Sequence, residues 1–142
     1  PLWIGGTGSR VLRATALFAD GLNVNGSPTV REYQERLDVL RQHCLKVGRE
    51  FKSIRLSHFI QIITASDRPS LEQLIKKEAR RIGLRPDEFL SQTRAFVGPP
   101  EECAEYLQSF IDLGVSQFML LFPYRHESAS LRVVAEQVLP KL

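Results

Sequence analysis

The chain has 142 residues, of which 43% are hydrophobic and 25% are charged, and this composition is typical of a single soluble globular domain. Its 19 Lys and Arg against 16 Asp and Glu give a formal charge of +3, and the basic residues are dispersed, so we expect no nucleic-acid partner. The sequence shows no apolar run of about 18 residues and no charged-then-apolar leader. We therefore expect no membrane association and a cytoplasmic location.

The first residues predict a strand that leads into a glycine-rich turn. Residues 1–4 are mostly apolar, and Gly5–Ser9 contains three glycines and two hydroxyl side chains. Glycines permit positive φ and let backbone N–H groups approach a ligand, and the helix predicted from Ser9 to about Phe18 would point its positive end at the same place. This pattern fits a phosphate-binding loop, and it equally fits a tight strand-to-helix turn.

The rest of the chain alternates predicted strands and helices. Further strands are predicted at residues 19–24, 54–65 and 117–122, and helices at about 28–47, 67–82, 86–90, 100–113 and 128–139. The helix at 28–47 has Ser27 as its expected N-cap, Pro28 at its first position and Gly48 at its end. We predict one domain over residues 1–142, with an extra helical insertion at about 84–97.

Strands that alternate with helices predict a parallel sheet with right-handed crossovers. Four such βα units can form either an open doubly wound sheet or half of a (β/α)₈ barrel. The order of the elements does not separate these two folds.

Several isolated side chains could act in catalysis or metal binding, but their sequence context favours structural roles. Cys44 and Cys103 lie on apolar helix faces, which predicts buried thiols rather than a disulfide or a metal site. His43 stands beside Cys44 but would need ligands from elsewhere, so no metal site is predicted. His58 lies inside a strand, where a hydrogen-bonded structural histidine is favoured over a ligand contact, and Asp20 is expected to hold a turn or backbone donors. No nucleophile elbow supports hydrolysis.

Four segments taken together resemble the bacterial-luciferase-like monooxygenase superfamily, and most of all its deazaflavin-dependent branch. These segments are residues 1–9, 19–23, 98–102 and 114–118, and the chain also has a similar ending at 131–140. The resemblance implies an α/β fold, the C-terminal half of a TIM (β/α)₈ barrel, made of four parallel βα units that correspond to strands five to eight. A strand that begins at Pro1, with no Met or flexible lead-in, is also what we expect of a chain cut inside a larger fold.

The same resemblance implies a cofactor site. In that family the loop after strand five binds the phosphate of FMN or of an F420-type deazaflavin coenzyme. The residues at the matching positions are Gly5, Gly6, Thr7, Gly8 and Ser9. Arg125 and His126 directly follow the last predicted strand, where barrel loops meet substrate, so they are candidate contacts for a small-molecule substrate, with a solvated loop as the alternative. No catalytic residue can be assigned.

The expected function is therefore to supply the cofactor-phosphate loop of a luciferase-like flavin- or deazaflavin-dependent oxidoreductase. Such an enzyme would be a monooxygenase or a hydride-transferring reductase or dehydrogenase, and the isolated chain is expected to be inactive. The alternative is a non-catalytic half-barrel that serves as a binding or assembly module. Because half a barrel exposes strand edges and apolar surface, we expect a homodimer or a partner that supplies the N-terminal half.

Overall fold

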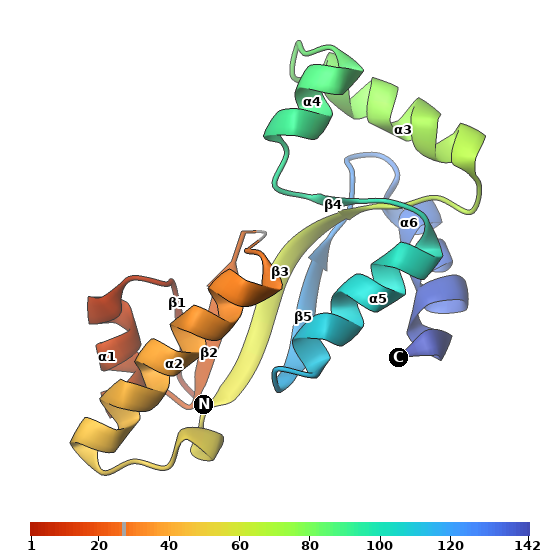
Figure 1. Ribbon diagram of the computed structural model, residues 1–142. Helices are drawn as coiled ribbons and strands as arrows, with labels where there is room; N and C mark the ends of the chain where they lie inside the picture. The colour runs from red at the N-terminus through yellow and green to blue at the C-terminus, as the bar shows by residue number, and fades with distance from the viewer. Residues whose placement is uncertain (27) are drawn as a thin grey trace. The chain divides into compact units, whose positions relative to one another are not determined.

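The computed structural model describes residues 1–26 and 28–142, and the chain divides into two compact units. Unit 1 comprises Pro1–Phe59 and Ser109–Met119, and unit 2 comprises Ile60–Gln108 and Leu120–Leu142. Three elements, coloured yellow, cyan and blue in Figure 1, contribute residues to both units: β3 (Arg55–Ile63), α5 (Pro100–Ile111) and β5 (Val115–Leu121).

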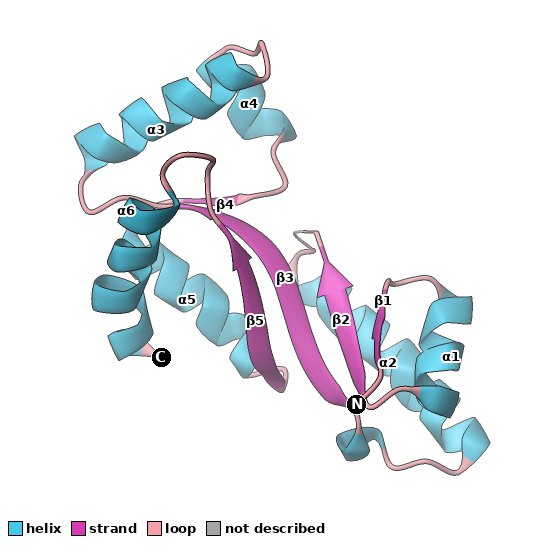
Figure 2. Ribbon diagram, turned by 180° about the vertical axis from the view of Figure 1, so that it is seen from behind, coloured by secondary structure: helices cyan, strands magenta, loops and turns pink. Residues whose placement is uncertain are grey.

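Unit 1 is built from successive βα pairs. Its elements are β1 (Trp3–Gly5), α1 (Ser9–Phe18), β2 (Gly21–Asn25), α2 (Val30–Val47), the short 3₁₀ turn η1 (Phe51–Ser53) and the unit 1 parts of β3, α5 and β5. β1 pairs in parallel with β2, and β2 pairs in parallel with β3 (Figure 2). β5 also pairs with β3. The helices α1 and α2 pack against each other.

The helix α2 begins later than its sequence predicts. Its N-cap is Thr29, whose hydroxyl accepts the backbone N–H of Glu32 while the Glu32 carboxylate accepts the backbone N–H of Thr29. This reciprocal pair satisfies two helix-end donors and makes Thr29 the N-cap. The predicted cap, Ser27, lies outside the described residues. The predicted end is confirmed, since Gly48 caps the helix with φ 69°.

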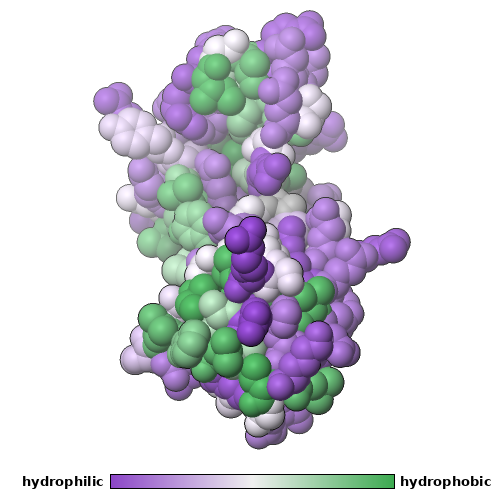
Figure 3. All heavy atoms as spheres, turned by 90° about the vertical axis from the view of Figure 1, so that its left-hand side faces the viewer, coloured by the Kyte–Doolittle hydropathy of each residue, from purple (hydrophilic) through white to green (hydrophobic). Residues whose placement is uncertain are grey.

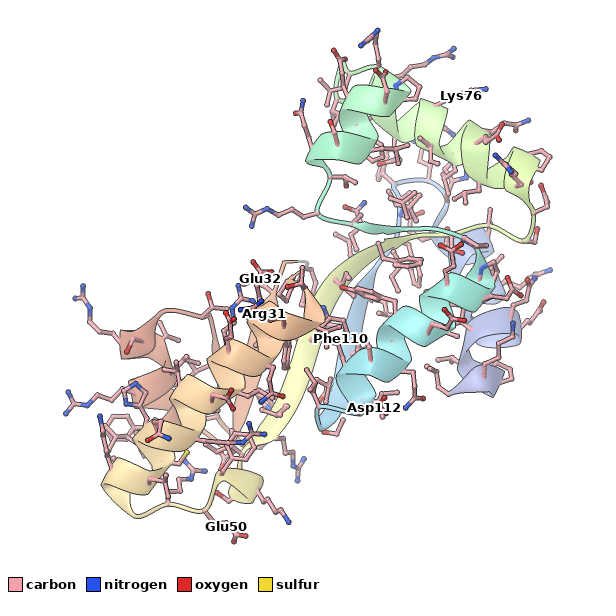
Figure 4. All side chains as sticks on the ribbon, viewed as in Figure 1. Arg31, Glu32, Glu50, Lys76, Phe110 and Asp112 are labelled. Carbon is pink, nitrogen blue, oxygen red and sulfur yellow. The ribbon has the colours of Figure 1, made fainter. Side chains whose placement is uncertain are left out.

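The core of unit 1 contains an aromatic cluster around His58. The ring of His58 lies 4.6 Å from that of Phe110 and 5.7 Å from that of Tyr33, measured between centroids. Figure 4 labels Phe110 on α5. On a neighbouring part of the sheet, the indole of Trp3 packs over Gly21, its partner in the strand register. This packing is possible because Gly21 has no side chain.

Unit 2 is made of the remainder of β3, α5 and β5 together with α3 (Arg68–Arg81), α4 (Pro86–Gln92), β4 (Phe96–Val97) and α6 (Glu127–Val133). The chain continues from α6 as a π-helical turn, η2 (Val134–Val138), and a 3₁₀ turn, η3 (Leu139–Lys141). Asp67 caps α3 through the backbone N–H of Ser70, as predicted. A small core of Ile63, Leu74, Ala79 and Phe89 joins α3, α4 and β3.

The sequence reading did not predict β4, which falls within the segment expected to be a helical insertion. Its two residues pair in parallel with Ile62 and Ile63, and the next residue, Gly98, donates its N–H to the carbonyl of Ile63. A strand of two residues is too short to show a periodic hydrophobic pattern in the sequence. β4 is therefore a strand only because it pairs with β3. In the part of the chain that the structure describes, no helix has the length and apolar character needed to cross a membrane.

Candidate functional site

The predicted phosphate loop forms the turn between β1 and α1 in unit 1. Gly6 has φ 134°, a conformation that side chains rarely allow, and its N–H donates to the carbonyl of Asn23 at 3.2 Å. Gly8 is the N-cap of α1 and supplies no side-chain hydrogen bond to the helix end, and the first turn carries no acidic residue. Nothing lies within 4 Å of the position that a Cβ at Gly8 would take. The helix end is therefore open and electropositive.

A hollow of about 340 Å³ lies beside this turn, between α1 and α2. Thr7 and Ser9 line it from the turn, and Arg36 lines it from α2. The Nη1 atom of Arg36 is buried and has no hydrogen-bond partner among the described residues. The hydroxyl of Ser9 lies 3.3 Å from Nε2 of His43, within hydrogen-bond distance.

Among the described residues, Arg36 forms no ion pair, although acidic side chains lie near it in the hollow. Two carboxylates also line it, those of Glu32 and Glu35. Glu35 pairs with Arg31 at 3.0 Å, and Glu32 accepts the N–H and the hydroxyl of Thr29; Arg31 and Glu32 are labelled in Figure 4. Because both carboxylates have other partners, the guanidinium of Arg36 can serve an anion.

These features fit a phosphate group. An uncapped helix end, a glycine turn and a buried guanidinium nitrogen without a partner are the groups that bind phosphate oxygens in proteins. The sequence predicts the turn as the phosphate loop, but it does not point to Arg36, and it suggests His43 only as a metal ligand, a role that is rejected. The spacing of Glu32, Arg36, Val39 and His43 does place these residues on one face of α2. The sequence does not indicate which other helix packs against this face.

His58 and Asp20 have the structural roles that the sequence predicted. His58 is fully buried, and its Nδ1 lies 3.0 Å from the carbonyl oxygen of Val24. Burial lowers the pKa of His58, and the charge of Arg36 lowers it further, while the bond to Val24 opposes both effects. The Asp20 carboxylate accepts the backbone N–H of Leu2 and so holds the start of β1.

Both thiols are free and buried, as predicted. Burial raises the pKa of Cys44, and it raises the pKa of Cys103 to about 12. A thiol with so high a pKa is protonated at neutral pH and is a poor nucleophile. Among the described residues, no three His, Cys, Asp or Glu side chains gather into a group that could hold a metal ion.

The candidate substrate residues lie in unit 2, in the turn between β5 and α6. Arg125 is exposed with φ 64°, and its guanidinium lies 5.3 Å from the ring centroid of Tyr124. His126 lies at the start of α6, and its Nε2 is 2.6 Å from Nζ of Lys77 on α3. Although the two residues are adjacent in sequence, they have different partners, and His126 is the one that lines a cavity.

No family model matches the chain. Among curated proteins, it is similar to a phthiodiolone/phenolphthiodiolone dimycocerosates ketoreductase from Mycobacterium sp. (strain JLS), with 30% identity over 80 residues. The aligned segment covers 56% of this chain and 21% of that protein.

Two solved structures show the fold. The coenzyme F420 dependent tetrahydromethanopterin reductase from Methanopyrus kandleri matches with a TM-score of 0.72 and 14% identity over 99% of this chain and 50% of its own. A riboflavin lyase (RcaE) with modified FMN and riboflavin matches with a TM-score of 0.71 and 17% identity over 98% of this chain and 42% of its own. The chain thus spans at most about half of these chains. The chain therefore has the fold of about half of each of these structures, and the predicted α/β half of a TIM barrel is confirmed.

Proposed function

We propose that this chain supplies the cofactor-phosphate site of a flavin- or deazaflavin-dependent oxidoreductase. The observation that carries the proposal is one hollow lined by Thr7 and Ser9, at the uncapped start of α1, and by Arg36, whose buried Nη1 has no partner among the described residues. The similar structures support it, because one is of an F420-dependent enzyme and another contains modified FMN.

Each residue of the site has a definite task in this proposal. Gly6 bends the chain so that the backbone N–H groups at the start of α1 face the phosphate oxygens. The hydroxyls of Thr7 and Ser9 add donors, and Arg36 supplies the positive charge. When bound, the cofactor would supply hydride transfer or oxygen chemistry, and the protein would hold and orient it. The substrate would be a small molecule, with Arg125 and His126 as its candidate contacts.

Titration of the chain with F420 and with FMN, followed by cofactor fluorescence, tests the proposal. Replacing Arg36 by Met removes a charged hydrogen-bond donor, a loss of about 1.5–3 kcal/mol, so the dissociation constant should rise about ten- to hundredfold. Lys46→Met is the matched control, because Lys46 is an exposed cation on the same helix, does not line the hollow and forms no ion pair with Glu32 or Glu35. It should leave the affinity unchanged.

A second pair of variants tests the turn without disturbing the fold. Both Asp and Asn are favoured N-caps, and a side chain at Gly8 meets open space. Gly8→Asp places a negative charge where the phosphate would lie and should abolish binding, whereas the uncharged Gly8→Asn should weaken it far less. The proposed function is wrong if wild type binds neither cofactor, or if Gly8→Asp and Gly8→Asn bind equally well.

The alternative function, a self-associating half-barrel, has one observation in its favour. Within unit 1, strand residues Phe59 and Met119 are 37% and 38% exposed, although large apolar side chains on strands are usually covered. Figure 3 also shows hydrophobic residues on the surface over unit 1. Sedimentation of wild type and of a Phe59→Asn, Met119→Asn double variant separates the two functions. Assembly through these residues predicts that the double variant is monomeric and the wild type is not.

A further inference from the structure

We infer that unit 2 contains a second binding site, for a small organic anion. A cavity of about 400 Å³ lies between α3, α6 and the segment that follows β3, all within unit 2. This volume is within the usual range for small-molecule pockets. His126, a candidate substrate contact in the proposed function, lines this cavity, so the inference rests on that part of the proposal and gives the substrate a chemical class. It is independent of the cofactor-phosphate site, because the cavity contains no residue of the Gly5–Ser9 turn.

The wall of this cavity contains a buried polar group without a partner. Thr64 is 1% exposed and lines the cavity, and its Oγ1 has no hydrogen-bond partner among the described residues. A buried hydroxyl without a partner costs about 1–3 kcal/mol. A ligand oxygen in the cavity would satisfy it.

The positive charge of the cavity comes from Lys77. Its Nζ lies 2.6 Å from Nε2 of His126, and because an ammonium group only donates, the imidazole nitrogen is the acceptor in this contact. Within the described residues, no carboxylate lies within ion-pair distance of Lys77. The lysine therefore brings an unneutralised charge to the cavity.

The remaining lining residues determine the shape of the ligand. The hydroxyls of Ser66 and Ser70 already donate to Asp67, at 3.1 Å and 2.9 Å, so their protons are not free for a ligand. The side-chain donors among the other lining residues are Thr64, Lys77, Ser130 and the amide of Gln73. The other walls are apolar, from Ala65, Leu74, Ala129 and Val133. This combination fits a carboxylate or phosphate joined to a small apolar body.

Benzoate, phenyl phosphate and the neutral benzamide are suitable probes, and NMR of the His126 ring in the full 142-residue chain reports binding. Both anions should shift the resonance, and benzamide should bind at least about tenfold more weakly, since a charged hydrogen bond is lost. The tighter of the two anions identifies the head group. Equal binding of benzamide, or no binding of any probe at about 10 mM, would overturn the inference.

Two variants connect this binding to the named residues. Lys77→Met should weaken benzoate binding about tenfold, whereas Lys76→Met, on the same helix but outside the cavity lining and labelled in Figure 4, should not. Thr64→Val removes the hydroxyl with little change of shape, so it should weaken binding about threefold or more without lowering the melting temperature of the free chain. Equal effects of Lys76→Met and Lys77→Met, or a Thr64→Val chain that is less stable but binds normally, would refute the assignment.

Discussion

Replacing Gly21 by Ala tests how β1 is held beside the proposed cofactor loop. Gly21 lies opposite Trp3 in the parallel pair of β1 and β2. A Cβ at Gly21 would lie 2.3 Å from Cε3 and 2.5 Å from Cδ2 of the Trp3 indole. Carbon atoms in contact are about 3.5–4.0 Å apart, so the indole would have to move by at least about 1 Å.

The expected loss of stability follows from this displacement. Overpacking of this kind costs about 1–3 kcal/mol, and the gain from replacing Gly by Ala in the unfolded chain offsets about 0.4–1 kcal/mol of it. The middle of these two ranges gives a fall of about 1.3 kcal/mol in the free energy of unfolding, with an upper bound of about 2.6 kcal/mol. Because Trp3 and Gly5 both belong to β1, cofactor affinity should also fall.

Urea unfolding followed by fluorescence measures this effect directly, because Trp3 is the only tryptophan in the sequence. Gly21→Ala should lower the urea midpoint and change the emission of the folded chain. Gly8→Ser is the matched control, since a Cβ at Gly8 has open space and Ser is a favoured N-cap, so midpoint and emission should stay as in wild type. If Gly21→Ala has the wild-type midpoint and emission, the indole of Trp3 does not cover Gly21, and the packing of β1 against β2 described above is wrong.

Three further predictions concern the rest of the molecule. Burial lowers the pKa of His58 below about 6.5, so below that pH the unfolded chain binds more protons than the folded chain. The contribution of His58 to the free energy of unfolding should be fully present above about pH 6.5 and should fall by up to about 1.4 kcal/mol per pH unit below it. Urea unfolding of His58→Phe at a series of pH values should lack this pH-dependent contribution. Cys103, with a pKa of about 12, and the buried Cys44 should escape iodoacetamide until urea unfolds the chain, as checked by mass spectrometry; labelling of the folded chain would contradict their burial. Thr29→Ala should cost about 1 kcal/mol in a denaturant titration, whereas Thr29→Ser, which keeps the cap, should cost little.

The order of the elements was predictable because each long helix and each buried strand carries its own periodic pattern. Tyr33, Leu37, Leu40 and Cys44 on α2 are all buried, as their spacing indicates. The boundaries depended on weaker signals, and the start of α2 was wrong because Thr29 and Glu32 form a capping box two residues after the expected cap. β4 could not be predicted, since its two residues are ordered by pairing with β3 rather than by any local pattern.

The candidate site was predictable where it is local in sequence and not where it depends on packing. The Gly6 turn is a local feature, and its positive φ follows from the residue type. Arg36 lies more than 25 residues away from the turn in sequence, and only the packing of α1 against α2 brings it to the same hollow. In the same way, Lys77 meets His126 across 49 residues, so neither the charge nor the unpartnered Thr64 hydroxyl of the second cavity could be inferred from motifs.

The turn between β1 and α1 is held in place by hydrogen bonds from other parts of unit 1. Gly6 donates to the carbonyl of Asn23 on β2, the hydroxyl of Ser9 lies within hydrogen-bond distance of His43 on α2, and Asp20 accepts the N–H of Leu2 at the start of β1. Contacts from both the sheet and the helix side leave the loop little to lose in conformational freedom when a phosphate binds. Less of the binding energy from Arg36 and the open end of α1 would then be spent on ordering the loop. For this reason a single charge change at Arg36 or Gly8 should have a large effect on cofactor binding.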